Sequence, residues 1–413
     1  MVLRAFAVAV AAVACFACLS PDEADRGDAS AQRVDPVVLV PGDAPTPGAV
    51  RLAAVFPTVD RYAASGMQSL NGVRLAVDEI NHAGGIHGRR LELREYRTGS
   101  YFVDAQRAAV LAIEDGALGI VGANSSELSK AIAEEVEARG VVQVSNVSTA
   151  QDLTWVPETG QNRDFVFRVC SSDVVMGALL AEYAVEDLGA RRAAVLYEVG
   201  REYSNKLARS FIERFEETAG RAPREFFYLA LETDFRPQLE LIADYRPDVV
   251  FVPGSFTDAT LIGAQATDLG LTATFLGGDG WSNPLLFRRG GPPGEAYFAE
   301  LCSPSAEFER RYQRVFGAPT QGCRALLGYD AVQVVAAGVR SLGPLTDEAL
   351  EENLDDTRRL LRDAVATAEV EGASGVIRFD AHGDRRQGVA LSAVERGPDG
   401  RPIALVRKWL GEP

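Results

Sequence analysis

Two of the chain's three histidines lie in DEINHAGGIHGRRLELREY, residues 78–96, where metal chemistry is the first possibility to consider. His82 and His87 flank a glycine-containing turn, but no third ligand follows at a useful spacing. We therefore interpret the stretch as a helix stop followed by the start of a strand. The sequence also lacks H-E-x-x-H, G-x-S-x-G and Walker-type motifs, and its scattered histidines offer no obvious general base. It predicts no metal site, no cofactor and no catalytic residue.

Polar residues at the ends of predicted strands indicate binding chemistry instead. Ser125 and Ser126 follow a strand at 118–122 and begin a helix, where hydroxyl and unpaired N–H groups can hold a carboxylate. Asp279 follows a strand at 272–278, where an acidic side chain can pair with an ammonium group. Local alternatives remain, because the serines could simply cap the helix and the aspartate could cap its own turn. Three neighbouring glycines would allow close backbone approach: Gly277, Gly278 and Gly280.

A repeated alternation of strands and helices must position these residues. Apolar residues spaced three and four apart form one predicted helix face (Met67, Leu70, Val73, Val77, Ile80), and Gly84-Gly85 follows as a stop signal. Strands are predicted at 50–56, 89–96, 118–122 and 141–145, with helices at about 103–115 and 127–139. After residue 173 the pattern restarts, with strands at 192–198, 225–231, 248–254 and 272–278 and helices at 204–219, 235–245 and about 256–268. This alternation predicts an α/β fold with two parallel sheets, each covered by helices on both faces.

The rest of the chain is predicted to return across both sheets. Helices are expected at about 304–316, 325–341 and 347–366, and strands near 374–379 and 389–395. We therefore divide the folded part into two lobes. Lobe one takes residues 50–172 and 301–370, and lobe two takes residues 173–300 and 371–413.

Length and charge exclude some classes of function. The 413 residues, of which 47% are hydrophobic, are enough for two or three domain-sized cores. A formal net charge of −16 argues against a nucleic-acid-binding protein, which would need a basic face. The acidic excess indicates solubility more than any particular partner.

The N-terminus, MVLRAFAVAVAAVACFACLS, has a short basic start and an apolar run of signal-peptide length, too short to span a membrane comfortably. Cys15 and Cys18 each follow an alanine and resemble the lipidated cysteine of a bacterial lipoprotein signal, and Cys15 is the better match. An ordinary cleaved signal is the alternative. We expect residues 1–18 to be a leader and the mature chain to be exported. Residues 19–49, rich in Pro, Asp, Ala and Gly, are predicted to form a flexible tether.

Three cysteines remain beyond the leader. In an oxidising compartment one pair is expected to form a disulfide. We favour Cys302–Cys323, with Cys170 as a buried free thiol, while the sequence leaves the connectivity open. A loop of this size stabilises the folded chain by about 3 kcal/mol in the chain-entropy model.

The segment NGVRLAVDEINHAGGIHGRRLELREY, residues 71–96, resembles a motif near the start of the Leu/Ile/Val-binding family of type I periplasmic binding proteins. The motif reads approximately N-G-x-x-L-A-x-x-x-I-N-x-x-G-G-I-x-G-x-x-L. Matching blocks follow in order and at the right spacing, and the resemblance covers residues 50 to about 395. They include GANSSELSKAIA (122–133), VSNVSTAQDLT (144–154), FVFRVCSSDVVMGALLAEY (165–183), REYSNKLARSFIERF (201–215), FLGGDGW (275–281) and GYDAVQVVAAG (328–338).

This resemblance implies two doubly wound lobes joined by three crossovers, which close on a ligand like a Venus flytrap. The chain would then be the extracytoplasmic binding protein of an ABC importer, periplasmic or lipid-anchored to the cell envelope. Its partners would be an amino acid or a similar small molecule and the ABC permease subunits. It would bind no nucleic acid and would meet the membrane only through the lipid anchor.

The resemblance also implies roles for individual residues. The position of Ser126 holds the ligand's α-carboxylate, Thr149 adds a hydroxyl and an N–H, and the Val147 carbonyl accepts from the ammonium. Asp279 stands where some relatives carry a glutamate that pairs with the ammonium. The alternative for residues 147–149 is a turn rich in Ser and Thr. Only a closed cleft would satisfy both ends of a zwitterion, so ligand should favour closure.

Two further residues match the cleft of the family. Tyr203 corresponds to a tyrosine of the second lobe that closes over the ligand, and Asp173 to an acid at the first crossover. The alternatives are a packing aromatic at Tyr203 and a helix N-cap at Asp173.

Four serines depart from the branched-chain amino-acid binder. Ser65 and Ser255 replace aromatic residues at the mouth and wall of its pocket, and Ser100 and Ser125 replace its disulfide. The departures favour a roomier or more polar pocket around Ser255. A polar or larger amino acid, an amide, a urea or an aromatic acid therefore remains an alternative ligand, and a sensory binding protein remains an alternative function.

Overall fold

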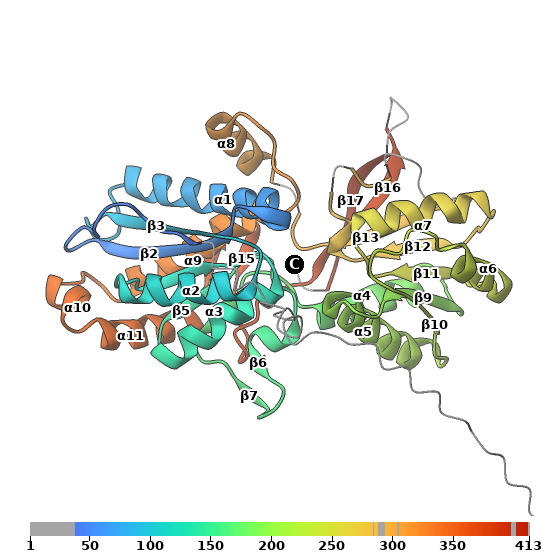
Figure 1. The fold of residues 1–413 in the computed structure, drawn as a ribbon, viewed down its shortest axis with the longest axis horizontal. Coiled ribbons are helices and arrows are strands. Elements are labelled where there is room, and N and C mark those ends of the chain that lie inside the picture. The colour runs from blue at the N-terminus through green and yellow to red at the C-terminus, as the bar shows by residue number, and fades with distance from the viewer. Residues whose placement is uncertain (1–37, 284, 288–293, 304, 398–401, 412–413) are drawn as a thin grey trace, which may run out of the picture. The chain divides into compact units, whose positions relative to one another are not determined.

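Two sheets carry the fold of the described residues, which are 38–283, 285–287, 294–303, 305–397 and 402–411 of a computed structural model (Figure 1). Each sheet is built from strands that alternate with helices along the chain. The apolar strands are almost entirely buried because helices cover both faces of each sheet.

The first sheet has the order β1-β3-β2-β4-β5-β8. Its neighbouring strands are parallel, except that β1 runs antiparallel to β3. Alternate residues of β2 join two separate apolar clusters, one with helices α1 and α9 and one with helices α2 and α3. The strands are β1 (Val38–Leu39), β2 (Val50–Pro57), β3 (Leu91–Thr98), β4 (Gly119–Gly122), β5 (Val142–Ser145) and β8 (Val166–Arg168), and the helices are α1 (Ala63–His82), α2 (Phe102–Glu114), α3 (Ser126–Arg139), α8 (Ala306–Phe316), α9 (Arg324–Ser341), α10 (Asp347–Glu351) and α11 (Leu354–Ala366).

The second sheet has the order β10-β9-β11-β12-β13-β16-β17. Its first five strands are parallel, and β16 and β17 extend it as an antiparallel hairpin. Helices α4 and α5 cover one face, and α6 and α7 cover the other. The strands are β9 (Ala193–Glu198), β10 (Arg224–Tyr228), β11 (Val249–Val252), β12 (Thr274–Gly277), β13 (Ala296–Glu300), β16 (Val389–Arg396) and β17 (Pro402–Leu410), and the helices are α4 (Asp173–Glu186), α5 (Glu202–Ala219), α6 (Arg236–Tyr245) and α7 (Phe256–Asp268).

The chain passes between the sheets three times: from β8 to α4, from β13 to α8, and from β15 (Gly375–Ile377) to β16. The predicted fold, two doubly wound α/β lobes joined by three crossovers, is confirmed. Two small hairpins lie outside the main sheets, β6 (Trp155–Val156) with β7 (Gln161–Asn162) and β14 (Val370–Gly372) with β15. No helix among the described residues has the length and apolar character needed to cross a membrane.

The predicted tether is wrong for residues 38–49. Strand β1 pairs with β3, and the segment after it is held by side chains of the first sheet. The Thr46 N–H donates to Glu92, and Arg94 donates to the Asp43 carbonyl over 2.9 Å. The composition is that of a linker, yet the edge of β3 offers unpaired backbone groups that this segment satisfies. The predicted leader, with Cys15 and Cys18, and tether residues 19–37 lie outside the described part of the chain.

The predicted boundary at residue 371 is also too early. Asp330, buried in α9 beside the first sheet, accepts the Ala373 N–H over 2.6 Å and the Ser374 N–H over 3.0 Å. These bonds keep the β14–β15 hairpin with the first lobe, and the chain joins the second sheet only at β16. The helix predicted at about 347–366 is interrupted, because Asn353 turns back and donates its N–H to the Glu348 carbonyl.

The histidine-containing stretch forms the helix end and the strand start that the sequence predicted. Helix α1 ends at His82, Gly84 and Gly85 follow with positive φ, and β3 begins at Leu91. The His82 and His87 rings each bond a different backbone carbonyl. No cluster of three or more His, Cys, Asp or Glu suited to a metal occurs among the described residues.

Candidate functional site

A cavity of about 90 Å³ lies where the carboxyl ends of strands from both sheets meet the crossover segments. The first sheet contributes Asn124 after β4 and Val147 after β5. The second sheet contributes Asp279 and Ser282 after β12. The remaining lining residues, Leu301, Cys323 and Arg324, come from the second crossover and from the start of α9.

Helix α3 begins beside this cavity without a side-chain cap. Ser125 is the N-cap residue, but its hydroxyl is buried and has no hydrogen-bond partner. The Ser126 hydroxyl accepts the Ala150 N–H over 3.2 Å. Neither serine side chain therefore caps the helix, so the alternative of a simple helix cap is wrong. The start of the helix suits an anion.

The loop after β5 places its backbone at the same end of the sheet. Val147 lines the cavity, and Thr149 is buried. The Thr149 carbonyl accepts the Asp173 N–H over 2.8 Å, so this loop touches the first residue of α4. The contact joins the two lobes beside the cavity.

Arg168 holds this loop in place, and sequence reasoning missed it. Its guanidinium is fully buried and forms two 2.7 Å bonds to the Asp384 carboxylate. A third bond, also 2.7 Å, goes to the Ala150 carbonyl. The only sequence signal was a lone charge inside the apolar run FVFRVC.

Asp279 and Tyr203 form a pair on the second lobe's wall. The Tyr203 hydroxyl donates to Asp279 Oδ1 over 2.9 Å and accepts the Gly280 N–H over 3.0 Å. Burial raises the pKa of the Asp279 carboxyl, and the Tyr203 hydrogen bond opposes that rise. A Cβ at Gly278 would lie 2.6 Å from the Tyr203 oxygen, so only glycine leaves room for this contact.

Asp173 is a second buried acid near the cavity. It is the first residue of α4 and is 1% exposed, and neither carboxylate oxygen has a hydrogen-bond partner. Burial, followed by the charge of Asp279, raises its pKa to about 7. The N-cap of α4 is Ser172, which accepts the Val175 N–H, so the N-cap alternative for Asp173 is wrong.

Arg324 is the cationic residue of the cavity wall, and it was not predicted. Burial lowers the pKa of its guanidinium, and the charge of Asp279 opposes this effect. Its side chain makes one long hydrogen bond among the described residues, 3.5 Å from Nη1 to the Gln321 carbonyl. Its place just after Cys323 and before a predicted helix was the only signal in the sequence.

The predicted serines have different positions. Ser255 is the N-cap of α7 in a capping box with Asp258, and it does not line the cavity. The Ser65 hydroxyl accepts from Asn124 Nδ2 over 2.7 Å and thereby supports one wall. Ser100 is buried and accepts the Tyr62 N–H, away from the lining residues.

The predicted disulfide between Cys302 and Cys323 is confirmed, with 5.8 Å between the Cα atoms. It ties the second crossover to the start of α9, next to Arg324. Cys170 is the buried free thiol that was predicted, and burial raises its pKa to about 12. A thiol with such a pKa is no nucleophile at neutral pH.

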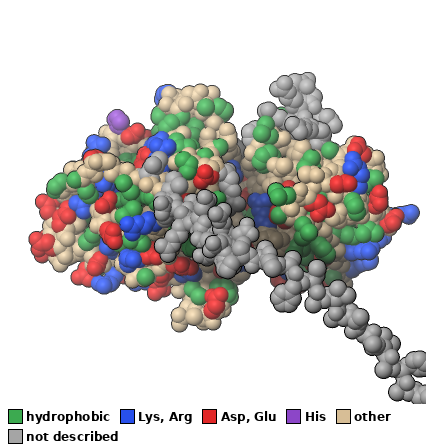
Figure 2. Space-filling view, in the orientation of Figure 1, with side chains coloured by type: hydrophobic (Ala, Val, Ile, Leu, Met, Phe, Trp, Pro, Cys, Tyr) green, Lys and Arg blue, Asp and Glu red, His purple; other side chains and the backbone are tan. Residues whose placement is uncertain are grey.

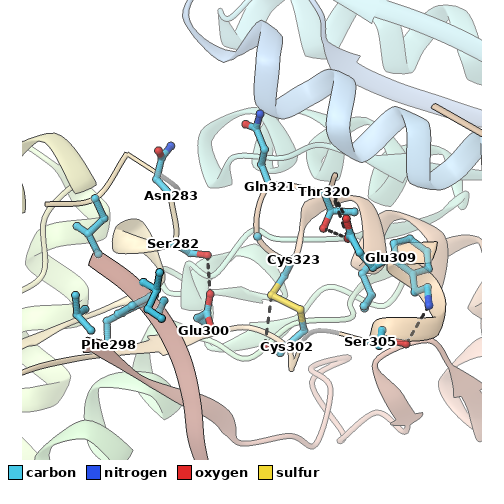
Figure 3. A pocket seen from close by; sticks show the side chains of 18 residues that line it. Ser282, Asn283, Phe298, Glu300, Cys302, Ser305, Glu309, Thr320, Gln321 and Cys323 are labelled. Carbon is cyan, nitrogen blue, oxygen red and sulfur yellow. Dashed lines mark hydrogen bonds between the residues drawn. A yellow bond between two sulfur atoms is a disulfide. The ribbon is translucent and has the colours of Figure 1, made fainter. Parts of the chain in front are cut away.

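A larger pocket of about 550 Å³ adjoins the cavity and shares Ser282 and Cys323 with it (Figure 3). Figure 3 shows the disulfide between its two sides, with Phe298 and Glu300 on one side and Glu309 on the other. Both carboxylates already have partners, since Ser282 and Ser392 donate to Glu300 and Thr320 donates to Glu309.

The arrangement can bind a small dipolar molecule. One lobe offers a helix start and hydroxyls for an anion, and the other offers Asp279 for a cation. Acidic and basic side chains are both spread over the face of the molecule in Figure 2. Two α/β lobes with a polar cavity at their strand ends define a two-lobed solute-binding protein.

Comparison with known proteins gives the family. Residues 49–397 match the periplasmic binding protein family, and the chain belongs to it. The Leu/Ile/Val-binding protein homolog 3 of Brucella melitensis is 24% identical, over 81% of this chain and 88% of the relative. The Leu/Ile/Val-binding protein BraC3 of Rhizobium johnstonii is 27% identical, over 75% and 84%. The crystal structure of the leucine-binding protein LivK of Thermotoga maritima is similar with a TM-score of 0.73 and 28% identity, over 88% of this chain and 99% of that chain.

Proposed function

We propose that this protein binds an α-amino acid in the 90 Å³ cavity and presents it to the membrane subunits of an ABC importer. The observation that carries the proposal is that one cavity brings together groups suited to an anion and groups suited to a cation. The uncapped start of α3, with Ser126, suits the α-carboxylate. The Tyr203–Asp279 pair suits the α-ammonium.

The carboxylate would meet groups of the first lobe, and the ammonium would meet groups of both lobes. Thr149 and the N–H groups at Ser126 would hold the carboxylate, and the Val147 carbonyl would accept from the ammonium together with Asp279. An ammonium also compensates the buried carboxylate of Asp173, which has no hydrogen-bond partner of its own. The names of the relatives, which refer to leucine, isoleucine and valine, support an α-amino acid as the ligand class.

Closure on the ligand is supported by ion pairs that connect the lobes beside the cavity. Lys130 of α3 lies 2.8 Å from Glu202 of α5, and Lys206 of α5 lies 2.9 Å from Asp152. Both pairs cross from the first lobe to the second. They would stabilise the closed state that an importer's membrane subunits recognise.

The same proposal covers location and partners. The protein would act outside the cytoplasm, either free in the periplasm or anchored by lipid at Cys15 or Cys18, and its protein partners would be the permease subunits. It would perform no catalysis. A sensory role would use the same cavity. Neighbouring genes would separate these two roles, with permease and ATPase genes favouring transport and a sensor kinase gene favouring sensing.

The test is a thermal-shift screen of the purified protein against the twenty amino acids and simple amides, followed by calorimetry. A ligand at 100 times its dissociation constant stabilises by about 2.7 kcal/mol. Asp279→Ala should abolish amino-acid binding, whereas Asp268→Ala, an exposed acid at the end of α7, should leave it intact. Unchanged affinity in the Asp279→Ala protein would disprove the ammonium role.

A further inference from the structure

Arg324 is a cation in the cavity wall with no carboxylate partner within the described chain. Its guanidinium forms no salt bridge with a described Asp or Glu, and its one hydrogen bond is the 3.5 Å contact to the Gln321 carbonyl. Most of its N–H donors therefore have no hydrogen-bond partner among the described residues. A guanidinium has five such donors and no acceptor.

Two buried arginines, Arg168 and Arg358, have several partners each. Arg168 has a bidentate carboxylate and a carbonyl. Arg358 donates to the Ala117 and Ile113 carbonyls and to Asp355. Arg324 differs from these two, because its guanidinium lines the cavity and has a single long hydrogen bond among the described residues.

A neutral amino acid would leave Arg324 unpaired. Its carboxylate would lie at the start of α3, and its ammonium would lie at Asp279 and the Val147 carbonyl. Closure would then desolvate the guanidinium while no anion is hydrogen-bonded to it, which is unfavourable. A second carboxylate on the ligand removes this cost, because the planar guanidinium matches a carboxylate in two parallel hydrogen bonds.

The cavity also has space toward Arg324. Ser282 and Cys323 line both the small cavity and the 550 Å³ pocket beside it. Gly322 lines the larger pocket, and a Cβ there would crowd Ser282 Oγ at 2.8 Å, so glycine is needed at this position. The larger pocket therefore continues from the cavity through these shared residues, and it has space for the distal end of a ligand.

We infer that the ligand is a dicarboxylic amino acid whose side-chain carboxylate binds Arg324. The inference rests on the proposed function, since it assumes that the α-amino and α-carboxyl groups bind as described above. It adds the charge of the side chain, which the family does not specify.

The test compares acids with their amides in calorimetry of the purified protein: L-glutamate against L-glutamine, and L-aspartate against L-asparagine. At least one acid should bind ten times more tightly than its amide. Arg324→Gln should remove this preference, and Arg324→Lys should keep part of it because the charge remains. Arg310→Gln, at an exposed position on α8, is the matched control and should change nothing.

Three outcomes would overturn the inference. If an amide or leucine binds the wild-type protein as tightly as the acids do, Arg324 does not recognise a side-chain carboxylate of the ligand. The proposed function would still stand in that case. Equal weakening of acid and amide by Arg324→Gln would show that Arg324 binds the α-carboxylate. Absence of binding by every amino acid would remove the proposed function as well.

Discussion

The Tyr203 hydroxyl joins the start of α5 to the turn after β12, since it donates to Asp279 Oδ1 over 2.9 Å and accepts the Gly280 N–H over 3.0 Å. The phenol therefore orients one carboxylate oxygen while the other stays available for a ligand. Positioning by a neighbour is typical of groups that must meet a ligand at a defined angle.

Tyr203→Phe removes this orientation and keeps the ring. We expect the Kd for the amino acid to rise about five- to tenfold, roughly 1–1.4 kcal/mol, the usual worth of such a bond. Calorimetry measures the change. Tyr245→Phe at the end of α6 serves as the control, and an unchanged Kd in the Tyr203 variant would contradict the positioning role.

The pH dependence of stability should report on Asp173. Its pKa is about 7 in the folded protein and 3.8 as the ordinary value, so between these pH values the folded state keeps a proton that the unfolded state has lost. The free energy of unfolding should consequently fall as pH rises from about 4 to about 7, by roughly 1.4 kcal/mol per pH unit at most, and level off above.

Asp173→Asn isolates this contribution. Denaturant unfolding of both proteins between pH 4 and 8 should show the variant gaining stability relative to wild type across that window, with a constant difference above it. Parallel curves would mean that Asp173 is charged throughout. A bound ammonium favours the charged carboxylate, so wild-type affinity should rise with pH over the same range.

The lysines that connect the lobes should control closure. Hydrogen bonds from Lys206 and Lys130 lower the pKa of the Asp152 carboxyl in spite of the burial that raises it. Lys206→Met should raise Kd two- to fivefold, as expected for partly exposed pairs of about 0.2–1 kcal/mol each, and mainly through faster dissociation.

The third lysine is the control for that experiment. Lys408 pairs with Asp187 within the second lobe, so Lys408→Met removes the same charge without touching the contact between lobes. Stopped-flow dissociation at low and high salt distinguishes the two variants. The wild-type rate should approach that of Lys206→Met at high salt, and equal rates at low salt would rule out a role in closure.

A substitution at Ser255 tests whether this predicted ligand residue serves as a helix cap instead, as the structure indicates. Its hydroxyl accepts the Asp258 N–H over 3.2 Å, and the Asp258 carboxylate accepts the Ser255 N–H over 3.0 Å. Ser255→Ala should cost about 1 kcal/mol of stability with an unchanged Kd. A weaker Kd without loss of stability would return Ser255 to the binding site.

Several elements escaped prediction for physical reasons. Strand β17 begins with Pro402 and carries Arg407 and Lys408, which resembles a loop because edge strands tolerate proline and charge. Strand β13 lies shortly after the Gly- and Pro-rich sequence at 289–294, which hides it. Residues 38–49 have the composition of a tether, but pairing with β3 depends on an edge that only the folded sheet creates.

The periodicity of apolar residues determined the two α/β lobes, the order of strands and helices, and the polar positions at strand ends, including Ser126, Thr149 and Asp279. Such patterns are local, because they record which face of each element is buried. Only the tertiary structure decided which strand ends share one cavity. It brought Arg324 next to Asp279 through the second crossover, assigned Ser255 to a cap, and left Asp173 without a partner. These relations depend on packing between segments far apart in the chain, which no local pattern encodes.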